Sequence, residues 1–288
     1  MTPTVVAVGD LMTDIVVELG GPIALGTDTR ARITHRRGGA AANFAVAAAG
    51  LGAHVRFVAN VGDDADGRAL EDALRAADVE PRLSRGGRTG TIVVLVDDSG
   101  ERTMLNDRAS ASELAELPAG LLDEADALAL TGYSFLADPE RETVTALAAS
   151  ALAAGIPVIV DIASAGAVAT LGVDEFLTRL AAVAPTVVHC NEDEAQLVAT
   201  VQPVRELAGT VVVHRGDAPA MVHRGVDSTG VPPLVVEHVT DSTGAGDAFV
   251  AGWSVAFLNG ADALDATRSG HAAAAAHLHR QETSRAPR

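Results

Sequence analysis

Short apolar runs alternate with amphipathic or alanine-rich segments along most of this 288-residue chain. Short apolar runs bounded by turn residues are typical of buried strands, whereas longer segments with an apolar face are typical of helices. We predict strands near residues 4–8, 54–62, 89–97, 101–107, 125–132, 157–162, 186–191 and 210–216, and a hairpin-like stretch at 219–239. We predict helices near residues 40–50, 67–79, 141–155, 173–183, 192–198, 245–258 and 262–279.

The order of these elements predicts the fold class. Strands separated by single helices form βαβ units, so we predict an α/β protein: three α/β/α layers around a doubly wound, mainly parallel sheet. Two strand-rich stretches, at about 10–35 and 88–108, do not fit that alternation, and Asp98-Ser99-Gly100 is typical of a hairpin turn. We predict that both stretches form a small β-sheet lid on one domain spanning 1–288, which ends in a frayed polar tail at 281–288.

Charge and composition narrow the range of partners. The net charge is −17 and all 21 basic side chains other than histidine are arginine, a balance that disfavours nucleic acid. Without lysine, neither a Walker-A loop nor the strand lysine of protein kinases is available. A phosphate would therefore be held by backbone amides, arginines or a metal ion. No apolar run approaches the roughly 20 residues of a membrane helix, and the single cysteine, Cys190, favours a cytoplasmic protein.

The string Asp241-Ser242-Thr243-Gly244-Ala245-Gly246-Asp247 carries the strongest chemical signal. Small residues and two glycines directly before an apolar helix expose backbone N–H groups at its positive end, which predicts an anion site that needs no lysine. Asp247 falls in the first helical turn, where a carboxylate can accept the proton of an attacking hydroxyl. The alternative is an ordinary glycine-rich turn with a helix-capping aspartate.

Four segments in the expected order resemble the signatures of the ribokinase-like (PfkB) carbohydrate kinases. Residues 241–252 (DSTGAGDAFVAG) resemble the C-terminal signature, and residues 37–45 (RGGAAANFA) resemble the N-terminal one. Residues 55–70, with Gly62, Asp63 and Gly67, and residues 191–194 (NEDE) resemble the segments that lie between them. The resemblance implies a kinase that transfers the γ-phosphate of ATP to a hydroxyl of a sugar or sugar derivative.

The resemblance also implies roles in catalysis and nucleotide binding. Asp247 would be the base, in a loop whose amides form the anion hole: Gly244, Ala245 and Gly246. Asp241 would help to hold a monovalent cation such as K⁺. Asn191 and Glu194 would order Mg²⁺ and its waters beside the ATP phosphates, because hard oxygen ligands suit that ion. Contacts to the nucleotide would come from three further positions: Arg215, Gly216 and Thr243.

On the acceptor side, the resemblance implies that Asp14 and Asn43, with the backbone around Gly39, bind substrate hydroxyls. Asp14 has the alternative of ending a turn, and the acidic residues 191–194 that of starting a solvated helix. Ala40 stands where ribokinases carry lysine, so ribose has no particular support. Five arginines could hold a phosphate or carboxylate already on the substrate: Arg36, Arg37, Arg88, Arg102 and Arg108. We place Arg102 among the substrate-binding residues.

Two other functions stay open. A nucleoside kinase of the same family would stack its acceptor on apolar side chains, for which Tyr133, Phe135, Phe44 and Met104 are candidates. A catalytically silent, ligand-binding relative would keep the fold without its base or anion hole, both of which this sequence retains. A nicotinamide enzyme is disfavoured, because the first strand leads into no G-x-G-x-x-G turn. Open edges of the predicted lid sheet favour a homodimer.

Overall fold

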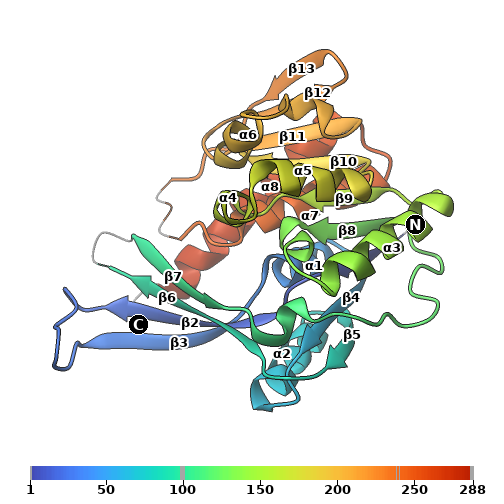
Figure 1. The fold of residues 1–288 in the computed structure, drawn as a ribbon. Coiled ribbons are helices and arrows are strands. Elements are labelled where there is room, and N and C mark those ends of the chain that lie inside the picture. The colour runs from blue at the N-terminus through green and yellow to red at the C-terminus, as the bar shows by residue number, and fades with distance from the viewer. Residues whose placement is uncertain (1, 98–100, 238, 240, 286–288) are drawn as a thin grey trace.

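The computed structural model describes residues 2–97, 101–237, 239 and 241–285 (Figure 1). Its large sheet has nine strands in the order β13-β12-β11-β10-β9-β8-β1-β4-β5. These are β1 Thr4–Val8, β4 His54–Val61, β5 Val79–Arg85, β8 Ala127–Thr131, β9 Val158–Asp161, β10 Val187–Asn191, β11 Thr210–Arg215, β12 Ala218–Arg224 and β13 Asp227–Val231. All neighbours pair in parallel except β11 with β12 and β12 with β13.

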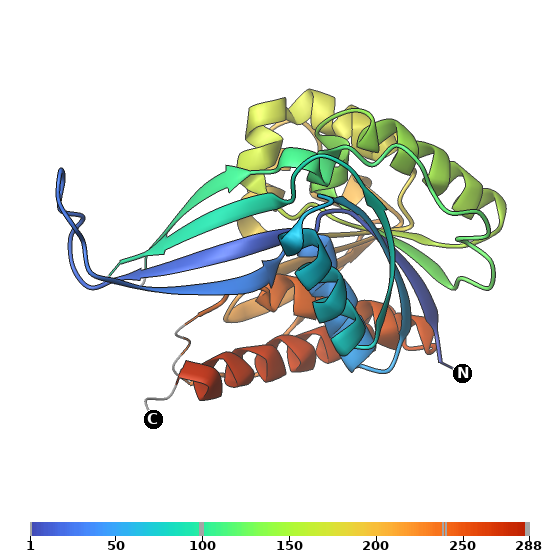
Figure 2. The same ribbon diagram turned by 90° about the horizontal axis from the view of Figure 1, so that it is seen from below.

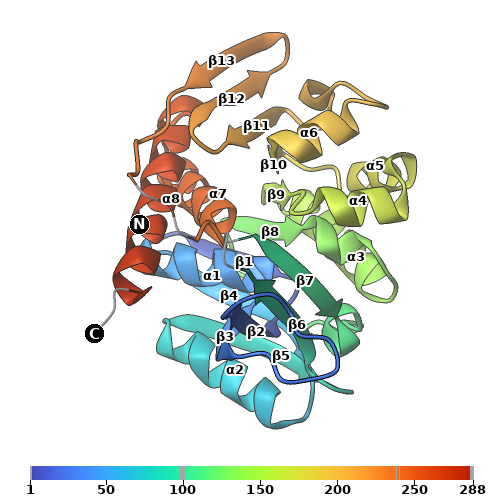
Figure 3. The same cartoon turned by 90° about the vertical axis from the view of Figure 1, so that its left-hand side faces the viewer.

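Helices cover both faces of this sheet, as Figure 3 shows from the side. One face packs on α1 Ala40–Gly50, α2 Ala65–Ala76, α7 Ala245–Leu258 and α8 Ala263–Arg285. The other packs on α3 Glu140–Ala153, α4 Ala165–Leu171, α5 Val173–Ala182 and α6 Glu192–Val198. Strand β1 is apolar throughout because both of its faces are buried. Val5 and Ala7 lie in the core on one side of the sheet, and Val6 and Val8 lie in the core on the other side. The predicted fold class is confirmed.

A second, four-stranded sheet, which we call the small sheet, has the order β3-β2-β6-β7. Its strands are β2 Met12–Leu19, β3 Ala31–Gly38, β6 Gly90–Val96 and β7 Arg102–Asp107. β2 pairs antiparallel with β3 and parallel with β6, and β6 pairs antiparallel with β7. Because β2 begins four residues after β1 ends, the small sheet starts at the carboxyl ends of the parallel strands and projects away from the large sheet (Figure 2).

The structure differs from the predicted elements in three places. The predicted helix at 67–79 ends earlier, and Val79 begins the unpredicted strand β5. The short helix α4 was not predicted. The prediction of a frayed tail at 281–288 is wrong for residues 281–285, because α8 continues to Arg285. The predicted hairpin turn at 98–100 lies outside the described residues.

None of the helices in the described ranges combines the length and apolarity needed to cross a bilayer. Cys190 is buried in the hydrophobic core that packs against α3–α6. Burial raises the pKa of Cys190 well above its ordinary value, so the thiol is protonated and unreactive.

Candidate active site

A cleft of about 720 Å³ lies between the small sheet and the carboxyl ends of the large sheet's strands. Ligand sites of open α/β sheets form at this edge, where loops leave the strand ends. The small sheet contributes alternate residues that point to the same side: Met12, Asp14 and Val16 of β2; Ile92, Val94 and Val96 of β6; Arg102, Met104 and Asn106 of β7. The opposite wall comes from strand ends, α1, and the start of α7.

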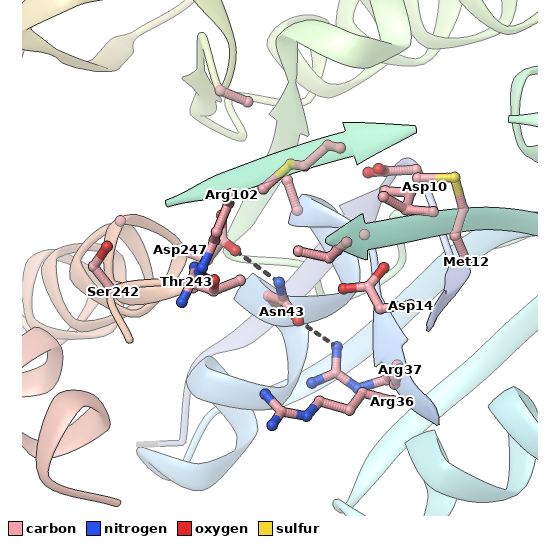
Figure 4. Close-up of a pocket in the computed structure, with 18 of the residues that line it drawn as sticks. Asp10, Met12, Asp14, Arg36, Arg37, Asn43, Arg102, Ser242, Thr243 and Asp247 are labelled. Atoms are coloured by element: carbon pink, nitrogen blue, oxygen red, sulfur yellow. Dashed lines mark hydrogen bonds between the residues drawn. The ribbon is translucent and has the colours of Figure 1, made fainter. Parts of the chain in front are cut away.

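The start of α7 places Asp247 in this cleft. Gly244 caps the helix in the left-handed conformation, with φ 78°, so the chain turns sharply before the first helical residue. Asp247 then lies in the first turn, and its Oδ2 accepts a hydrogen bond of 2.9 Å from Asn43 Nδ2 (Figure 4). Loss of hydration in this enclosed position raises the pKa of Asp247 to about 7, against the opposing effect of the Asn43 hydrogen bond.

Asn43 is oriented by a second partner. Arg37 Nη1 donates to Asn43 Oδ1 at 2.9 Å, and arginine can only donate. The amide oxygen must therefore face Arg37, which leaves the NH₂ group for Asp247. Figure 4 shows this chain of two hydrogen bonds from Arg37 through Asn43 to Asp247. Two residues from the N-terminal signature thus hold the carboxylate of the C-terminal signature.

Removing this support should shift the pH dependence of catalysis. Asn43 donates to the ionised form of Asp247, so its hydrogen bond lowers the pKa of that carboxyl. In Asn43→Ala we expect the acid limb of the pH–rate profile to move to higher pH, with about a tenfold loss of rate at pH 7. A steady-state profile from pH 5 to 9 measures this. A uniform loss of rate with an unmoved limb would contradict the assignment.

The two glycines before α1 lie very close to the Asp14 side chain and to the Asp10 backbone. A Cβ on Gly38 would lie 1.9 Å from Asp14 Oδ1, and one on Gly39 would lie 2.3 Å from the carbonyl oxygen of Asp10. Gly39 also has φ +102°, a conformation that side chains rarely adopt. The glycine pair therefore lets β3 pass closely over the residues that follow β1.

We expect Gly39→Ala to lower the free energy of unfolding by about 2–5 kcal/mol, because it adds a backbone clash to an unfavourable φ. Urea unfolding followed by circular dichroism measures the change. Gly50→Ala is the matched control, since nothing lies within 4 Å of a Cβ at Gly50. Equal unfolding midpoints for the two variants would contradict this explanation.

Asp14 faces the cleft from β2. Its Oδ1 is buried and has no hydrogen-bond partner among the described residues. Burial, with repulsion from Asp10, raises the pKa of Asp14 to about 6, although Arg37 and Arg36 act in the opposite direction. A carboxylate in this position is suited to accept a hydrogen bond from a ligand hydroxyl.

The loop before α7 is held by contacts that its sequence does not reveal. The Ala245 N–H donates to the Ser242 carbonyl at 3.1 Å, so this amide already has an acceptor. The N–H groups of Gly244 and Gly246 have none among the described residues. His277 on α8 hydrogen-bonds through Nε2 to the Thr243 carbonyl at 2.7 Å. Of the three amides predicted to form the anion hole, only those of Gly244 and Gly246 therefore lack an acceptor in the described part of the chain.

Asp241 is surrounded by positive charge. Arg102 forms an ion pair with it and also donates to Thr243 Oγ1, and Arg36 Nη1 lies 3.6 Å from Asp241 Oδ2. These hydrogen bonds, including one from the Thr243 N–H, lower the pKa of Asp241 to about 2 despite its burial. A monovalent cation here would meet two guanidinium groups, so this geometry gives the predicted cation site no support. Arg102, predicted to bind substrate, lies in the cleft but already has two partners.

The predicted magnesium residues form a helix cap. Asn191 Oδ1 accepts from the Glu194 N–H at 2.9 Å, and Glu194 Oε2 accepts from the Asn191 N–H at 2.8 Å. Both line the cleft beside Asp161, whose buried Oδ1 has no described partner. Burial raises the pKa of Glu194 to about 7 and that of Asp161 well above its usual range. Oxygen donors of this kind fit Mg²⁺.

Within the described ranges, no three His, Cys, Asp or Glu side chains are grouped as a direct metal site. Magnesium that keeps several waters and binds chiefly through phosphates agrees with such an arrangement. The predicted nucleotide residues Arg215 and Gly216 are outside the set that lines the cleft. Arg215 instead forms an ion pair of 2.8 Å with Glu192 on α6. Its neighbour His214 does reach the cleft, and burial lowers the pKa of this imidazole to about 4, so it is neutral.

Several cleft residues were not predicted to bind or react: Asp10, Asp161, His214 and His277. Asp10 and Asp161 could have been found, because each is an acidic residue at the carboxyl end of a buried apolar run. His277 could not, since only the packing of α8 against the loop brings it to Thr243. Gly62, Asp63 and Gly67 lie outside the cleft-lining set. Gly67 approaches Gly62 closely, with a built Cβ 2.3 Å from the Gly62 carbonyl oxygen.

Comparison with known proteins identifies the family of this chain. The model of the pfkB family carbohydrate kinases matches residues 2–287. The ATP-dependent ribose-1-phosphate kinase of Halopiger xanaduensis is 32% identical over 261 residues, which cover 87% of this chain and 83% of that protein. The chain therefore belongs to the PfkB family of carbohydrate kinases, and it is a phosphotransferase with an alcohol group as acceptor.

Two solved structures share the fold. The adenosine kinase of Sinorhizobium meliloti superimposes with a TM-score of 0.83 at 21% identity, covering 95% of this chain and 92% of that one. An uncharacterised sugar kinase from Pyrococcus horikoshii, solved in complex with ATP, gives 0.82 at 21% identity and covers 96% and 92%. At these identities the similarity concerns the fold alone.

Proposed function

We propose that this protein transfers the γ-phosphate of ATP to a hydroxyl of a sugar or sugar derivative, with Asp247 as the base. The hydrogen bond from Asn43 to Asp247 is the observation that carries the proposal. It joins the two signatures of the family at one carboxylate, inside a cleft large enough for an acceptor. A pKa of about 7 lets this carboxylate exchange a proton near neutral pH.

The reaction follows from the arrangement of the chain's own groups. Asp247 takes the proton of the acceptor hydroxyl as its oxygen bonds to the γ-phosphorus, and the bond from that phosphorus to the bridging oxygen breaks to release ADP. The Gly244 and Gly246 N–H groups, at the positive end of α7, stabilise negative charge on the transferring group. Asp14 and Asn43 orient the acceptor.

Asn191, Glu194 and Asp161 are the residues that would hold Mg²⁺ through water. The ion would neutralise charge on the phosphates of ATP. The three side chains line the same cleft as Asp247. We propose that the small sheet acts as a lid, because its inner face forms one wall of the cleft and would exclude water from the transfer.

A nucleoside acceptor receives less support. Of the four candidate stacking residues, Phe135 and Phe44 are buried at 0% and 5% exposure and do not line the cleft, whereas Met104 on β7 does. Tyr133 does, but the Arg108 guanidinium lies over its ring, 4.6 Å from the centroid. A homodimer formed through the small sheets stays a prediction. Ile33 on the edge strand β3 and Leu105 on the edge strand β7 are 59% and 55% exposed and would lie in such an interface.

Release of ADP from ATP and Mg²⁺ tests the proposal, with pentoses, hexoses, sugar acids, sugar phosphates and nucleosides as acceptors. We expect turnover with a sugar or sugar derivative, above the hydrolysis seen without acceptor. Turnover restricted to nucleosides would replace the proposal with its alternative. ATP hydrolysis that no acceptor accelerates would contradict phosphoryl transfer to a hydroxyl.

A further inference from the structure

Arg108 ends the inner face of the small sheet. It follows β7 directly and continues the alternation of Arg102, Met104 and Asn106 that faces the cleft. Its side chain is 17% exposed, and its guanidinium carbon lies over the ring of Tyr133, 4.6 Å from the centroid. A guanidinium is planar and presents a fork of N–H donors, which suits it to bind a carboxylate or a phosphate with two hydrogen bonds.

The hydrogen bonds of Arg108 are incomplete. Nε donates to Ser112 Oγ at 3.2 Å, whereas Nη1 and Nη2 are buried without an acceptor among the described residues. Asp10 is the nearest carboxylate, with Oδ2 3.7 Å from Nη1, which is attraction without a hydrogen bond. Leaving charged donors buried and unpaired is costly, so a ligand that supplied two oxygens here would gain strongly.

The other cleft arginines differ in this respect. Arg37 donates to Asn43, and Arg36 and Arg102 lie against Asp241. Each of them therefore supports the catalytic carboxylate or the loop before α7. Arg108, like Arg36, has a carboxylate close by, with Asp10 Oδ2 3.7 Å from Nη1. It differs from the other three in that both of its terminal nitrogens are buried without an acceptor among the described residues, and it lines the same cleft as Asp14 and Asp247.

The surroundings of Arg108 strengthen its attraction for an anion. Met12 and Ile92 line the same wall of the cleft, and apolar neighbours reduce the screening of charge by water. Asp10 acts electrostatically on Asp14, Tyr133 and Asp247, so it lies among the acceptor-side groups and the arginine. Its negative charge is opposed by Arg108, whose Nη1 lies 3.7 Å from Asp10 Oδ2.

We propose that the acceptor carries an anionic group of its own, phosphate or carboxylate, and that the Arg108 guanidinium binds this group while Asp14 and Asp247 face the hydroxyls. The proposal rests on the kinase function proposed above and narrows its substrate class to charged sugars. Arg108 thereby determines specificity, at the far end of β7 from the arginine that contacts the loop before α7.

Titration calorimetry without ATP tests the binding step, with ribose, ribose 1-phosphate, ribose 5-phosphate, glucose and gluconate as probes. We expect a charged sugar to bind more tightly than its neutral parent. Arg108→Met should weaken that binding about 10- to 100-fold and leave the neutral sugar unchanged. Arg108→Lys keeps the positive charge but loses the paired N–H donors of the guanidinium. Its affinity for the charged sugar should lie between those of the unmodified protein and Arg108→Met. Arg32→Met, an exposed arginine of the same sheet paired with Glu18, is the matched control.

The charged probes also identify the anionic group. Tighter binding of a ribose phosphate would indicate that Arg108 binds a phosphate, and tighter binding of gluconate would indicate a carboxylate. Equal loss of charged and neutral sugar binding in Arg108→Met would overturn the proposal, as would equal affinity for both in the unmodified protein. ADP release measured in parallel separates the two hypotheses. Turnover of neutral sugars that Arg108→Met leaves intact overturns the charged-sugar class while the kinase stands. Arg108-dependent anion binding without ADP release overturns the kinase.

Discussion

Replacing Asp247 by asparagine should lower kcat by about a thousandfold or more, because general base catalysis contributes 10²–10⁴ and the amide cannot accept the proton. ATP should bind Asp247→Asn as well as it binds the unmodified protein. The substitution keeps the size of the side chain and the hydrogen bond from Asn43 Nδ2 to an oxygen. Single-turnover measurements with saturating ATP and acceptor separate the chemical step from binding.

The unfolding of the same variant provides its control. A carboxyl group whose pKa is raised on folding destabilises the folded state above that pKa, because its ionised form has lost hydration. Asp247→Asn should therefore be at least as stable as the unmodified protein at pH 8. Loss of turnover in a stable variant locates the defect in catalysis. Turnover within tenfold of the unmodified rate would remove Asp247 from its assigned role.

The pH dependence of kcat/KM should show an acid limb with a midpoint near pH 7. Asp247 accepts a proton only as the carboxylate, and its pKa is raised to about 7. Activity is therefore lost as the pH falls through that value. The rate should drop tenfold for each pH unit below the midpoint, about a hundredfold at pH 5. Protonation of Asp14, whose pKa is raised to about 6, should steepen the limb further.

Steady-state rates between pH 5 and 9, at constant ionic strength, measure this profile. Thermal unfolding over the same range gives the control, because a folded protein at pH 5 shows that the loss is catalytic. A flat profile down to pH 5 would mean that the essential base has an ordinary carboxyl pKa. It would contradict the assignment of the desolvated Asp247.

Much of the fold could be predicted because periodicity reports burial directly. The run at 4–8 is apolar throughout, and its residues enter both cores. Strand β5 was missed because it lies at the sheet edge, where only Val79 is buried and polar residues hide the pattern. Helix α8 passed its predicted end because its C-terminal residues, although polar, suit a helix as well as a tail.

The candidate site was predictable where chemistry follows from local sequence. Asp247 could be assigned to a first helical turn from its neighbours alone. The close approach of Gly38 to Asp14 and of Gly39 to Asp10 appears only in the structure. The pairing of Arg102 with Asp241 spans 139 residues and joins the small sheet to the loop before α7, so no local pattern encodes it. Arg108 was one of several candidate arginines, and only its contacts with Tyr133 and Asp10 distinguish it.

Transfer of isotope from ATP labelled with ¹⁸O in the γ-phosphate tests the central claim most directly. With an accepted sugar and Mg²⁺, mass spectrometry should find the labelled phosphoryl group on the sugar in equal amount to the ADP formed. The Asp247→Asn protein should transfer no measurable label in the same time. Labelled inorganic phosphate beside unmodified sugar would contradict the account, because the γ-phosphate would then have passed to water.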